Sequence, residues 1–159
     1  MQQGRYYLLA LLVLLLDRVS KLWISARLAP GESIAVWPGV LHITAHENAG
    51  AAFGLLQGAR FFFLLITVVV IFAILWYLPR AMRQSAWLAV SLALILGGAL
   101  GNFVDRAATG RVIDFIDVRI IHYPIFNVAD SAITIGAALW FWTALRRTDR
   151  SAVGESGKE

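Results

Sequence analysis

The sequence contains no cysteine, and this absence excludes disulfide bonds, thiol nucleophiles and cysteine-ligated metals. Charged residues are scarce as well: they make up 15% of the chain, whereas a soluble domain carries about 25%. There are three histidines, and His42 and His46 lie in a segment whose apolar residues alternate as in a strand. That segment does not place the two imidazoles on one helix face, so we expect no metal site and no cofactor.

Apolar residues are abundant instead, at 59% of the 159 residues, with a mean hydropathy of +0.70. A helix needs about 20 mainly apolar residues to cross a ~30 Å hydrocarbon core. Four stretches approach this length, at about 6–24, 61–78, 86–104 and 128–145. We expect an all-α membrane protein in which residues 1–150 form one four-transmembrane-helix bundle, with Pro79 closing the second span. Charges within the first stretch, and the three stretches after it, argue against a cleaved signal peptide.

The net charge of +4 would favour a nucleic-acid partner in a soluble protein, but these cations lie between the spans and in the tail. We therefore expect no nucleic-acid partner and interpret the cations as topology signals. Seven of the 14 Lys and Arg residues concentrate on the side of the two termini and the 80–85 turn, and the other seven accompany seven acids. This predicts cytoplasmic termini and external connections at 28–60 and 105–127. The polar tail 151–159 is expected to be disordered.

The first connection has the pattern of a β-hairpin. Segments 33–37 and 40–45 alternate as strands do, and Pro38 and Gly39 between them are typical of a turn. We expect a small extracytoplasmic β-sheet and loop subdomain on the outer membrane surface. Three glycines predict that the stretch 48–60 is a movable cover: Gly50, Gly54 and Gly58.

Acidic and amide side chains gather toward the outer ends of the spans, at Asp17, Asn48, Asn102, Asp105, Asp114 and Asp130. Such groups are costly at membrane depth and are candidates for function. Asp17 and Lys21 lie four residues apart in the acid-first order, which predicts a structural or lipid-contacting ion pair. Gly97 and Gly101 form a G-x-x-x-G pattern, which favours close helix packing.

The string that opens the fourth span allows two interpretations. Asn127 is a good N-cap, and an acid three residues later, Asp130, imitates a capping box. The string 110–117 also allows two interpretations. In one, it forms an interfacial helix or strand in which Asp114 and Asp117 pair with nearby arginines. Alternatively, the connection between Asp114 and Asp130 folds back and brings the two carboxylates to one depth.

Two carboxylates a few ångströms apart share a proton, because both cannot ionise easily. One is then a base toward water and the other an acid toward the carbonyl or the leaving group. Two other hypotheses are a proton-coupled transporter and a scaffold assembled through Gly97 and Gly101. The uncharged second span argues against conduction, and a scaffold gives no reason for acids at Asp114 and Asp130.

Four blocks, in this order, resemble the bacterial lipoprotein signal peptidases (signal peptidase II) over about residues 6–147. They are Asp17-Arg-Val-Ser-Lys21, Asn48-Ala-Gly-Ala-Ala-Phe53, Gly101-Asn-Phe-Val-Asp-Arg106 with Gly110-Arg-Val-Ile-Asp-Phe115, and Phe126-Asn-Val-Ala-Asp-Ser131. The resemblance implies a membrane-embedded aspartic endopeptidase that cleaves diacylglyceryl-modified prolipoproteins just before the lipidated cysteine. The chain departs from the family pattern at Arg18, where Gln is frequent, and at His46 and Glu47, where an aromatic is common.

The resemblance also implies roles for residues and partners. It makes Asp114 and Asp130 the catalytic pair, and it gives substrate-holding or dyad-supporting roles to Asn48, Asn102, Asp105, Arg106 and Asn127. It implies the bacterial cytoplasmic (inner) membrane, with the site toward the outer face. The expected partners are prolipoprotein substrates, membrane lipid and inhibitors of the globomycin type, and we expect a monomer.

Overall fold

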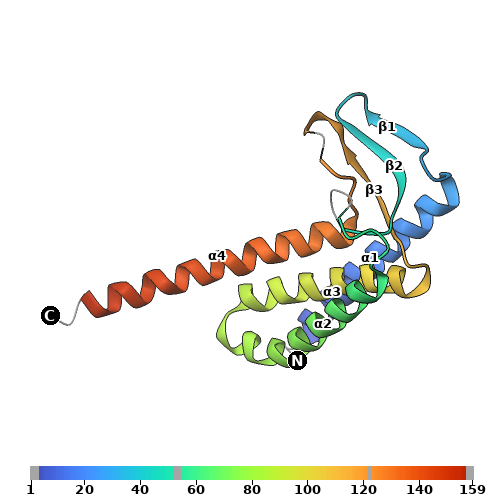
Figure 1. The fold of residues 1–159 in the computed structure, drawn as a ribbon. Coiled ribbons are helices and arrows are strands. Elements are labelled where there is room, and N and C mark those ends of the chain that lie inside the picture. Colours follow the sequence, from blue (N-terminus) through green and yellow to red (C-terminus); the bar gives the residue numbers. More distant parts are fainter. Residues whose placement is uncertain (1–3, 52–54, 122, 157–159) are drawn as a thin grey trace.

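The computed structural model describes residues 4–51, 55–121 and 123–156, so Gly54 and the end of the tail, 157–159, lie outside it. A helical bundle carries a three-stranded sheet at one end (Figure 1). The elements are α1 (Gly4–Arg27), β1 (Ser33–Trp37), β2 (Leu41–Asn48), α2 (Arg60–Gln84), α3 (Ala86–Ala108), β3 (Val112–Val118), the 3-10 turn η2 (Arg119–Ile121) and α4 (Val128–Ser156).

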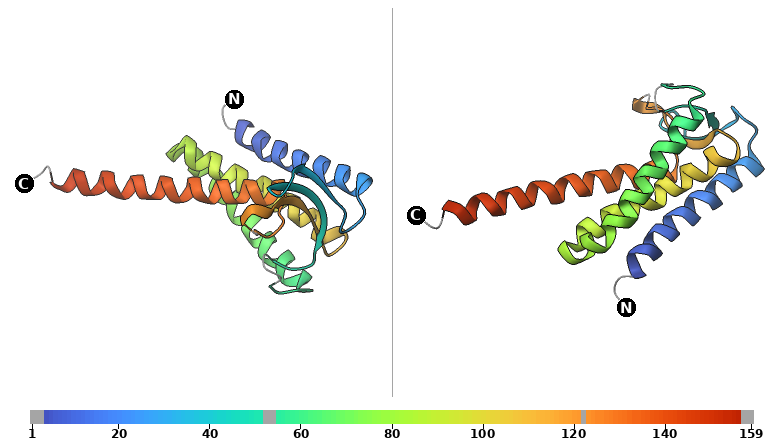
Figure 2. Two further views of the ribbon diagram at one scale, coloured as in Figure 1. Left: turned by 90° about the horizontal axis from the view of Figure 1, so that it is seen from above. Right: turned by 60° about the horizontal axis from the view of Figure 1, so that its bottom comes forward.

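Helix α3 is the centre of the bundle, and it packs against α1, α2 and α4 (Figure 2). About 61% of its apolar stretch is buried inside the protein, compared with 11% for α2 and 22% for α4. The outer helices therefore present most of their apolar surface outward, as helices in lipid do.

Glycines on α3 let the neighbouring helices approach closely. A Cβ atom added to Gly97 would lie 2.5 Å from the carbonyl oxygen of Ala10, and one added to Gly101 would lie 2.5 Å from Oδ2 of Asp17. The next glycine, Gly98, faces α4 in the same way, with Ile133 Cγ1 at 2.8 Å from an added Cβ. The close-packing interpretation of the G-x-x-x-G pattern is confirmed.

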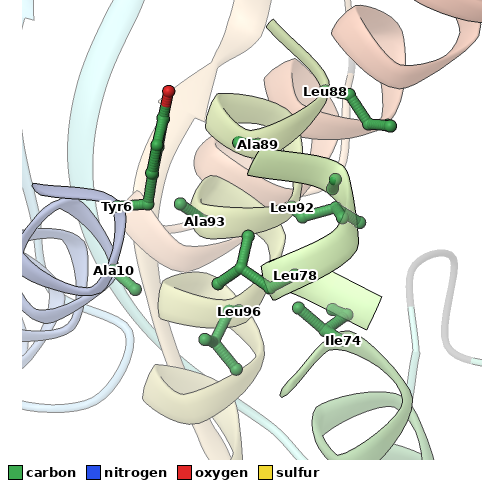
Figure 3. Close-up of a cluster of buried hydrophobic side chains, with 10 residues drawn as sticks. Tyr6, Ala10, Ile74, Leu78, Leu88, Ala89, Leu92, Ala93 and Leu96 are labelled. Atoms are coloured by element: carbon green, nitrogen blue, oxygen red, sulfur yellow. The ribbon is translucent and has the colours of Figure 1, made fainter. Parts of the chain in front are cut away.

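An apolar cluster fills the end of the bundle away from the sheet (Figure 3). Tyr6 and Ala10 of α1 meet Leu78 of α2 and Leu92 and Leu96 of α3 there, all at most 8% exposed. Because lipid tails are as apolar as these side chains, the cluster stabilises the bundle through close van der Waals packing rather than through removal of apolar surface from water. The polar groups of the candidate active site lie toward the other end, at the sheet.

Three helices are long and apolar enough to cross a membrane within the described part of the chain: α2, α3 and the Val128–Arg146 part of α4. Helix α1 is of similar length, but Asp17, Arg18 and Lys21 interrupt its apolar sequence. The composition of the helices therefore supports three spans directly, one fewer than we expected from the sequence.

Two helix ends differ from the sequence-based prediction. Helix α2 does not stop at Leu78 but passes through Pro79 to Gln84. Proline removes one N–H and so one helical hydrogen bond, here the bond to the Leu75 carbonyl, and membrane helices tolerate proline in their interior. Helix α4 continues to Ser156, into the segment expected to be disordered, because each residue added to an existing helix gains a hydrogen bond.

The sheet has the order β1-β2-β3 and is antiparallel throughout. The predicted hairpin is confirmed, with Gly39 at φ +76° in the turn, where a residue without a Cβ is favoured. Strand β3, from the second connection, adds to β2. Ile24 of α1, Ala45 of β2 and Phe115 of β3 form a second apolar cluster that seats the sheet on the bundle.

Candidate active site

Asp114 lies on β3 and is only 2% exposed. Its two carboxylate oxygens accept hydrogen bonds from two asparagine side chains. Asn127 Nδ2 donates to Oδ1 at 2.6 Å, and Asn48 Nδ2, from the end of β2, donates to Oδ2 at 3.1 Å. The carboxyl group is thus held from both sides by neutral donors, which fix its orientation without neutralising its charge.

Asp130 lies in the first turn of α4, where it forms a reciprocal capping box with Asn127. Its backbone N–H donates to Asn127 Oδ1 at 2.9 Å, and the Asn127 N–H donates to Asp130 Oδ2 at 3.3 Å. The capping interpretation is therefore confirmed, yet it occupies only one carboxylate oxygen. The other, Oδ1, accepts from Asn102 Nδ2 of α3 at 2.7 Å. Capping and a site role are compatible in this residue.

Both carboxylates open into one cavity of about 310 Å³ at the sheet end of the bundle. Its polar wall consists of Asn48, Asn102, Arg106, Asp114 and Asp130. The facing wall is largely apolar and comes from the segment before α4 and from α4 itself, at Tyr123, Pro124, Ile125, Phe126 and Ile133. A cavity of this kind can hold a chain with an apolar side against two carboxyl groups.

The electrostatics of the cavity favour a protonated Asp114. Burial, and after it the negative charge of Asp130, together raise the pKa of Asp114 from 3.8 to about 7. The hydrogen bonds from Asn48 and Asn127 oppose this rise only in part. At neutral pH, Asp114 therefore holds a proton for a large fraction of the time beside a second carboxylate.

A buried ionic network lies directly behind this cavity. Lys21 Nζ is 2.8 Å from Asp17 Oδ2 and 2.8 Å from Asp105 Oδ2, and both Asp17 and Lys21 are fully buried. Arg18 also pairs with Asp105. Since neither member of the Asp17–Lys21 pair reaches the surface, the lipid-contacting interpretation does not fit, and the pair joins α1 to α3.

The network continues into the site and to the start of α4. Lys21 Nζ donates to Asn102 Oδ1 at 3.0 Å, and the same amide donates to Asp130. Asp17 Oδ1 accepts the backbone N–H of Ala129 at 2.9 Å, which fixes the first turn of α4 against α1. A buried cation is therefore connected through a single amide to one of the two cavity carboxylates.

The remaining predicted site residues divide into two groups. Arg106 lines the cavity; its Nη2 donates to the carbonyl of Gly50 at 3.0 Å, and its guanidinium lies 4.6 Å from the ring centroid of Phe63. Asp105 instead faces the ionic network, although Oδ2 also accepts the Ile113 N–H at 3.4 Å, one residue before Asp114. Sequence reasoning missed Arg18 as the second partner of Asp105, because residues on different helices give no spacing signal.

The described residues contain no group of three His, Asp or Glu side chains placed to hold a metal ion. Within the cavity, two carboxyl groups accept hydrogen bonds from asparagine donors. Fold and cavity together define an integral membrane enzyme whose helical bundle holds a two-carboxylate site beneath a small sheet.

The chain belongs to the signal peptidase II family, which it matches over residues 9–146. It is 48% identical to a lipoprotein signal peptidase of Brevibacillus brevis over 134 residues, covering 84% of this chain and 90% of the relative. It is 45% identical to the lipoprotein signal peptidase of Bacillus subtilis (strain 168) over 138 residues, covering 86% and 90%.

Solved structures agree with this assignment. A structure described as a bacterial membrane enzyme determined by the in meso method at 2.3 Å resolution superposes with a TM-score of 0.88 at 40% identity, covering 92% of this chain and 91% of that one. A second bacterial membrane enzyme, determined by the same method at 1.9 Å resolution, gives a TM-score of 0.78, again at 40% identity, covering 89% and 93%.

Proposed function

We propose that this protein cleaves the signal peptide from diacylglyceryl-modified prolipoproteins just before the lipidated cysteine, with Asp114 and Asp130 as the catalytic pair. The observation that carries the assignment of the pair is their shared cavity, in which Asn127 contacts both residues and the pKa of Asp114 is about 7. Two carboxyl groups with one proton between them suit amide hydrolysis.

In the proposed mechanism Asp130 is the base and Asp114 the acid. Asp130 removes a proton from water as the water oxygen attacks the scissile carbonyl carbon, and Asp114 gives its proton to the carbonyl oxygen. When the tetrahedral intermediate collapses, Asp130 passes its proton to the leaving nitrogen and Asp114 regains the proton of the hydroxyl. The hydrogen bond from Asn102, which itself accepts from Lys21, holds the Asp130 carboxylate in place for this step.

The supporting residues have distinct proposed roles. Asn48, Asn102 and Asn127 orient the pair, and Arg106 holds the substrate at the cavity wall. Asp17, Lys21 and Asp105 act structurally, because they tie α1 to α3 and to the start of α4. The apolar wall of the cavity would hold the residues of the signal peptide next to the cleavage point, and it is also where an inhibitor of the globomycin type would bind. We expect a monomer.

We further propose that α1 is a fourth span, so that the chain is a four-helix membrane bundle. The supporting observation is the pairing of its internal charges: Lys21 with Asp17 and Asp105, and Arg18 with Asp105. Because these charges are paired and buried, most of the free-energy cost of placing them within the membrane is removed. This cost is the reason that α1 does not qualify as a span on composition alone. With four spans both termini lie in the cytoplasm, and the sheet and the cavity lie at the outer face of the bacterial inner membrane.

The test is cleavage of a diacylglyceryl-modified prolipoprotein by purified protein in lipid, compared with Asp114→Asn and Asp130→Asn. Asparagine keeps the shape of each side chain but removes its acid–base function, so both variants should lose at least about 10³-fold in kcat. Thermal unfolding and binding of uncleaved substrate should be retained. Substantial cleavage by either variant would show that the dyad is misassigned.

A further inference from the structure

A second cavity lies at the end of the bundle away from the sheet. It has a volume of about 340 Å³ and is formed by the first turns of two helices, with Arg5, Tyr6 and Leu9 from α1 and Ala86, Trp87 and Val90 from α3. Both helices run from this end toward the sheet, so the cavity lies a whole helix length from Asp114 and Asp130 (Figure 1). The proposed peptidase mechanism makes no use of it.

The cation at this cavity has a defined position. Arg5 Nη2 donates to the Tyr6 hydroxyl at 2.6 Å, and the guanidinium lies 4.7 Å from the centroid of the same ring. Tyr6 is itself only 5% exposed, because it packs in the apolar cluster beside α3 (Figure 3). The guanidinium is therefore held on a rigid support and keeps further N–H donors for another partner.

A second cation is connected to Trp87 through the ring of Trp142. The rings of Trp87 and Trp142 meet edge to face at 5.9 Å, and the guanidinium of Arg146 lies 4.1 Å from the Trp142 centroid. Tryptophan and arginine at the end of a membrane span are typical of the depth of the lipid headgroups. The cavity itself is lined by one cation, Arg5, and by apolar side chains that include Leu9 and Val90.

This end of the bundle has no compensating negative charge among the side chains that the structure describes. The ion pairs of the described residues all involve Arg18, Lys21, Arg111 or Arg119. These four cations lie on the half of the protein that carries the sheet. Arg5 and Arg146 contact aromatic rings instead. A cavity lined by a cation and by apolar side chains is complementary to a molecule with an anionic head and a hydrocarbon tail.

We propose that the cavity between α1 and α3 binds one anionic phospholipid, whose phosphate pairs with Arg5 and whose acyl chain lies along Leu9 and Val90. The lipid would fill the gap between the first turns of these two helices. The apolar cluster fills the space between the same helices only from Tyr6 toward the centre of the bundle. Binding at this position stabilises the contact of α1 with α3 and needs no occupied active site.

The test is thermal unfolding of purified protein in neutral detergent during titration with phosphatidylglycerol or phosphatidylcholine. Phosphatidylglycerol should raise the Tm at concentrations where phosphatidylcholine does not. Arg5→Gln should raise the half-saturating phosphatidylglycerol concentration about ten-fold, since it removes a charge-assisted contact. Arg83→Gln is the matched control, because it removes the same charge at the same end of the bundle but does not line the cavity.

Native mass spectrometry should show one retained phosphatidylglycerol on the wild type and loss of it in Arg5→Gln. Inorganic phosphate at the same concentration should neither raise the Tm nor displace the lipid, and displacement would assign the cavity to a free anion. Equal effects of Arg5→Gln and Arg83→Gln would show a diffuse field rather than a site. Equal effects of the two lipids on the wild type would also overturn the proposal.

Discussion

Asn127 and Asp130 cap one another at the start of α4, and the same asparagine donates to Asp114 at 2.6 Å. One side chain therefore starts a helix and joins the two cavity carboxylates. Because Asn127 is both the cap of α4 and a donor to Asp114, any shift of the cap would displace that donor. The start of α4 and the geometry of the site are therefore coupled.

The two tasks of Asn127 can be separated by substitution. Asn127→Ser retains a good N-cap but is too short to reach Asp114, so stability should change little while kcat falls at least about ten-fold. Asn127→Ala removes the cap as well and should cost a further ~1 kcal/mol of stability. Denaturation in mixed micelles and cleavage assays measure the two effects. Equal kcat for wild type and Asn127→Ser would show that the contact with Asp114 is dispensable.

The raised pKa of Asp114 predicts a pH dependence of activity and stability. Because this pKa is about 7 in the folded protein and 3.8 ordinarily, the folded state holds more protons between these values, and stability should fall as pH rises from about 4 through 7. Cleavage should decline above about pH 7, as the pair loses its shared proton. Asp114→Asn should lack this fall in stability. A variant with the same pH dependence as wild type would assign the titration to another group.

Lys21 is predicted to matter far more for stability than an exposed cation. Lys21→Met leaves Asp17 and Asp105 buried with one cation fewer, at a cost of about 3–5 kcal/mol. Arg111→Met breaks only the exposed pair with Glu47 and should cost less than about 1 kcal/mol. Denaturation of both variants gives the comparison. If Asp17→Asn combined with Lys21→Met is no more stable than Lys21→Met alone, the unpaired carboxylate is not the source of the loss.

Gly101 is predicted to tolerate no side chain. In Gly101→Ala the new methyl would lie 2.5 Å from Asp17 Oδ2 and 3.3 Å from the Ala129 Cβ, so α1 or α4 must shift, at a cost of about 1–3 kcal/mol. Gly4→Ala is the control, since an added Cβ there meets nothing within 4 Å. The unfolding temperatures of the two variants decide the matter, and similar values would argue against close packing at Gly101.

Local patterns in the sequence were sufficient for the features that depend on neighbouring residues. Gly39 and the alternation around it predict the hairpin, the spacing of Asn127 and Asp130 predicts the capping box, and Gly97 with Gly101 predicts close packing of helices. Each depends on backbone geometry within a few residues, which propensity describes well. The position of strand β3 was left open, because Asp114 and Asp117 interrupt the apolar pattern of a strand.

Contacts between distant segments could not be read from spacing. Asp105 was grouped with the dyad, whereas the structure turns it toward Lys21 and Arg18, and only the packing of α1 on α3 decides between these partners. The prediction for the end of α2 was wrong because it treated Pro79 as a stop, whereas a membrane helix can continue through a proline. The pairing of the charges within α1 likewise depends on α3.

The cavity is assembled from segments that leave the ribosome at different times: Asn48 at the end of β2, Asn102 on α3, Asp114 on β3 and finally Asp130 on α4. Until α4 has entered the bilayer, the first three face one another without their last partner, and Asp17 has no N–H of Ala129 to accept. In the mechanism proposed above, a chain without α4 lacks the carboxylate that serves as the base. The proposal therefore makes the onset of proteolysis depend on the insertion of the last helix.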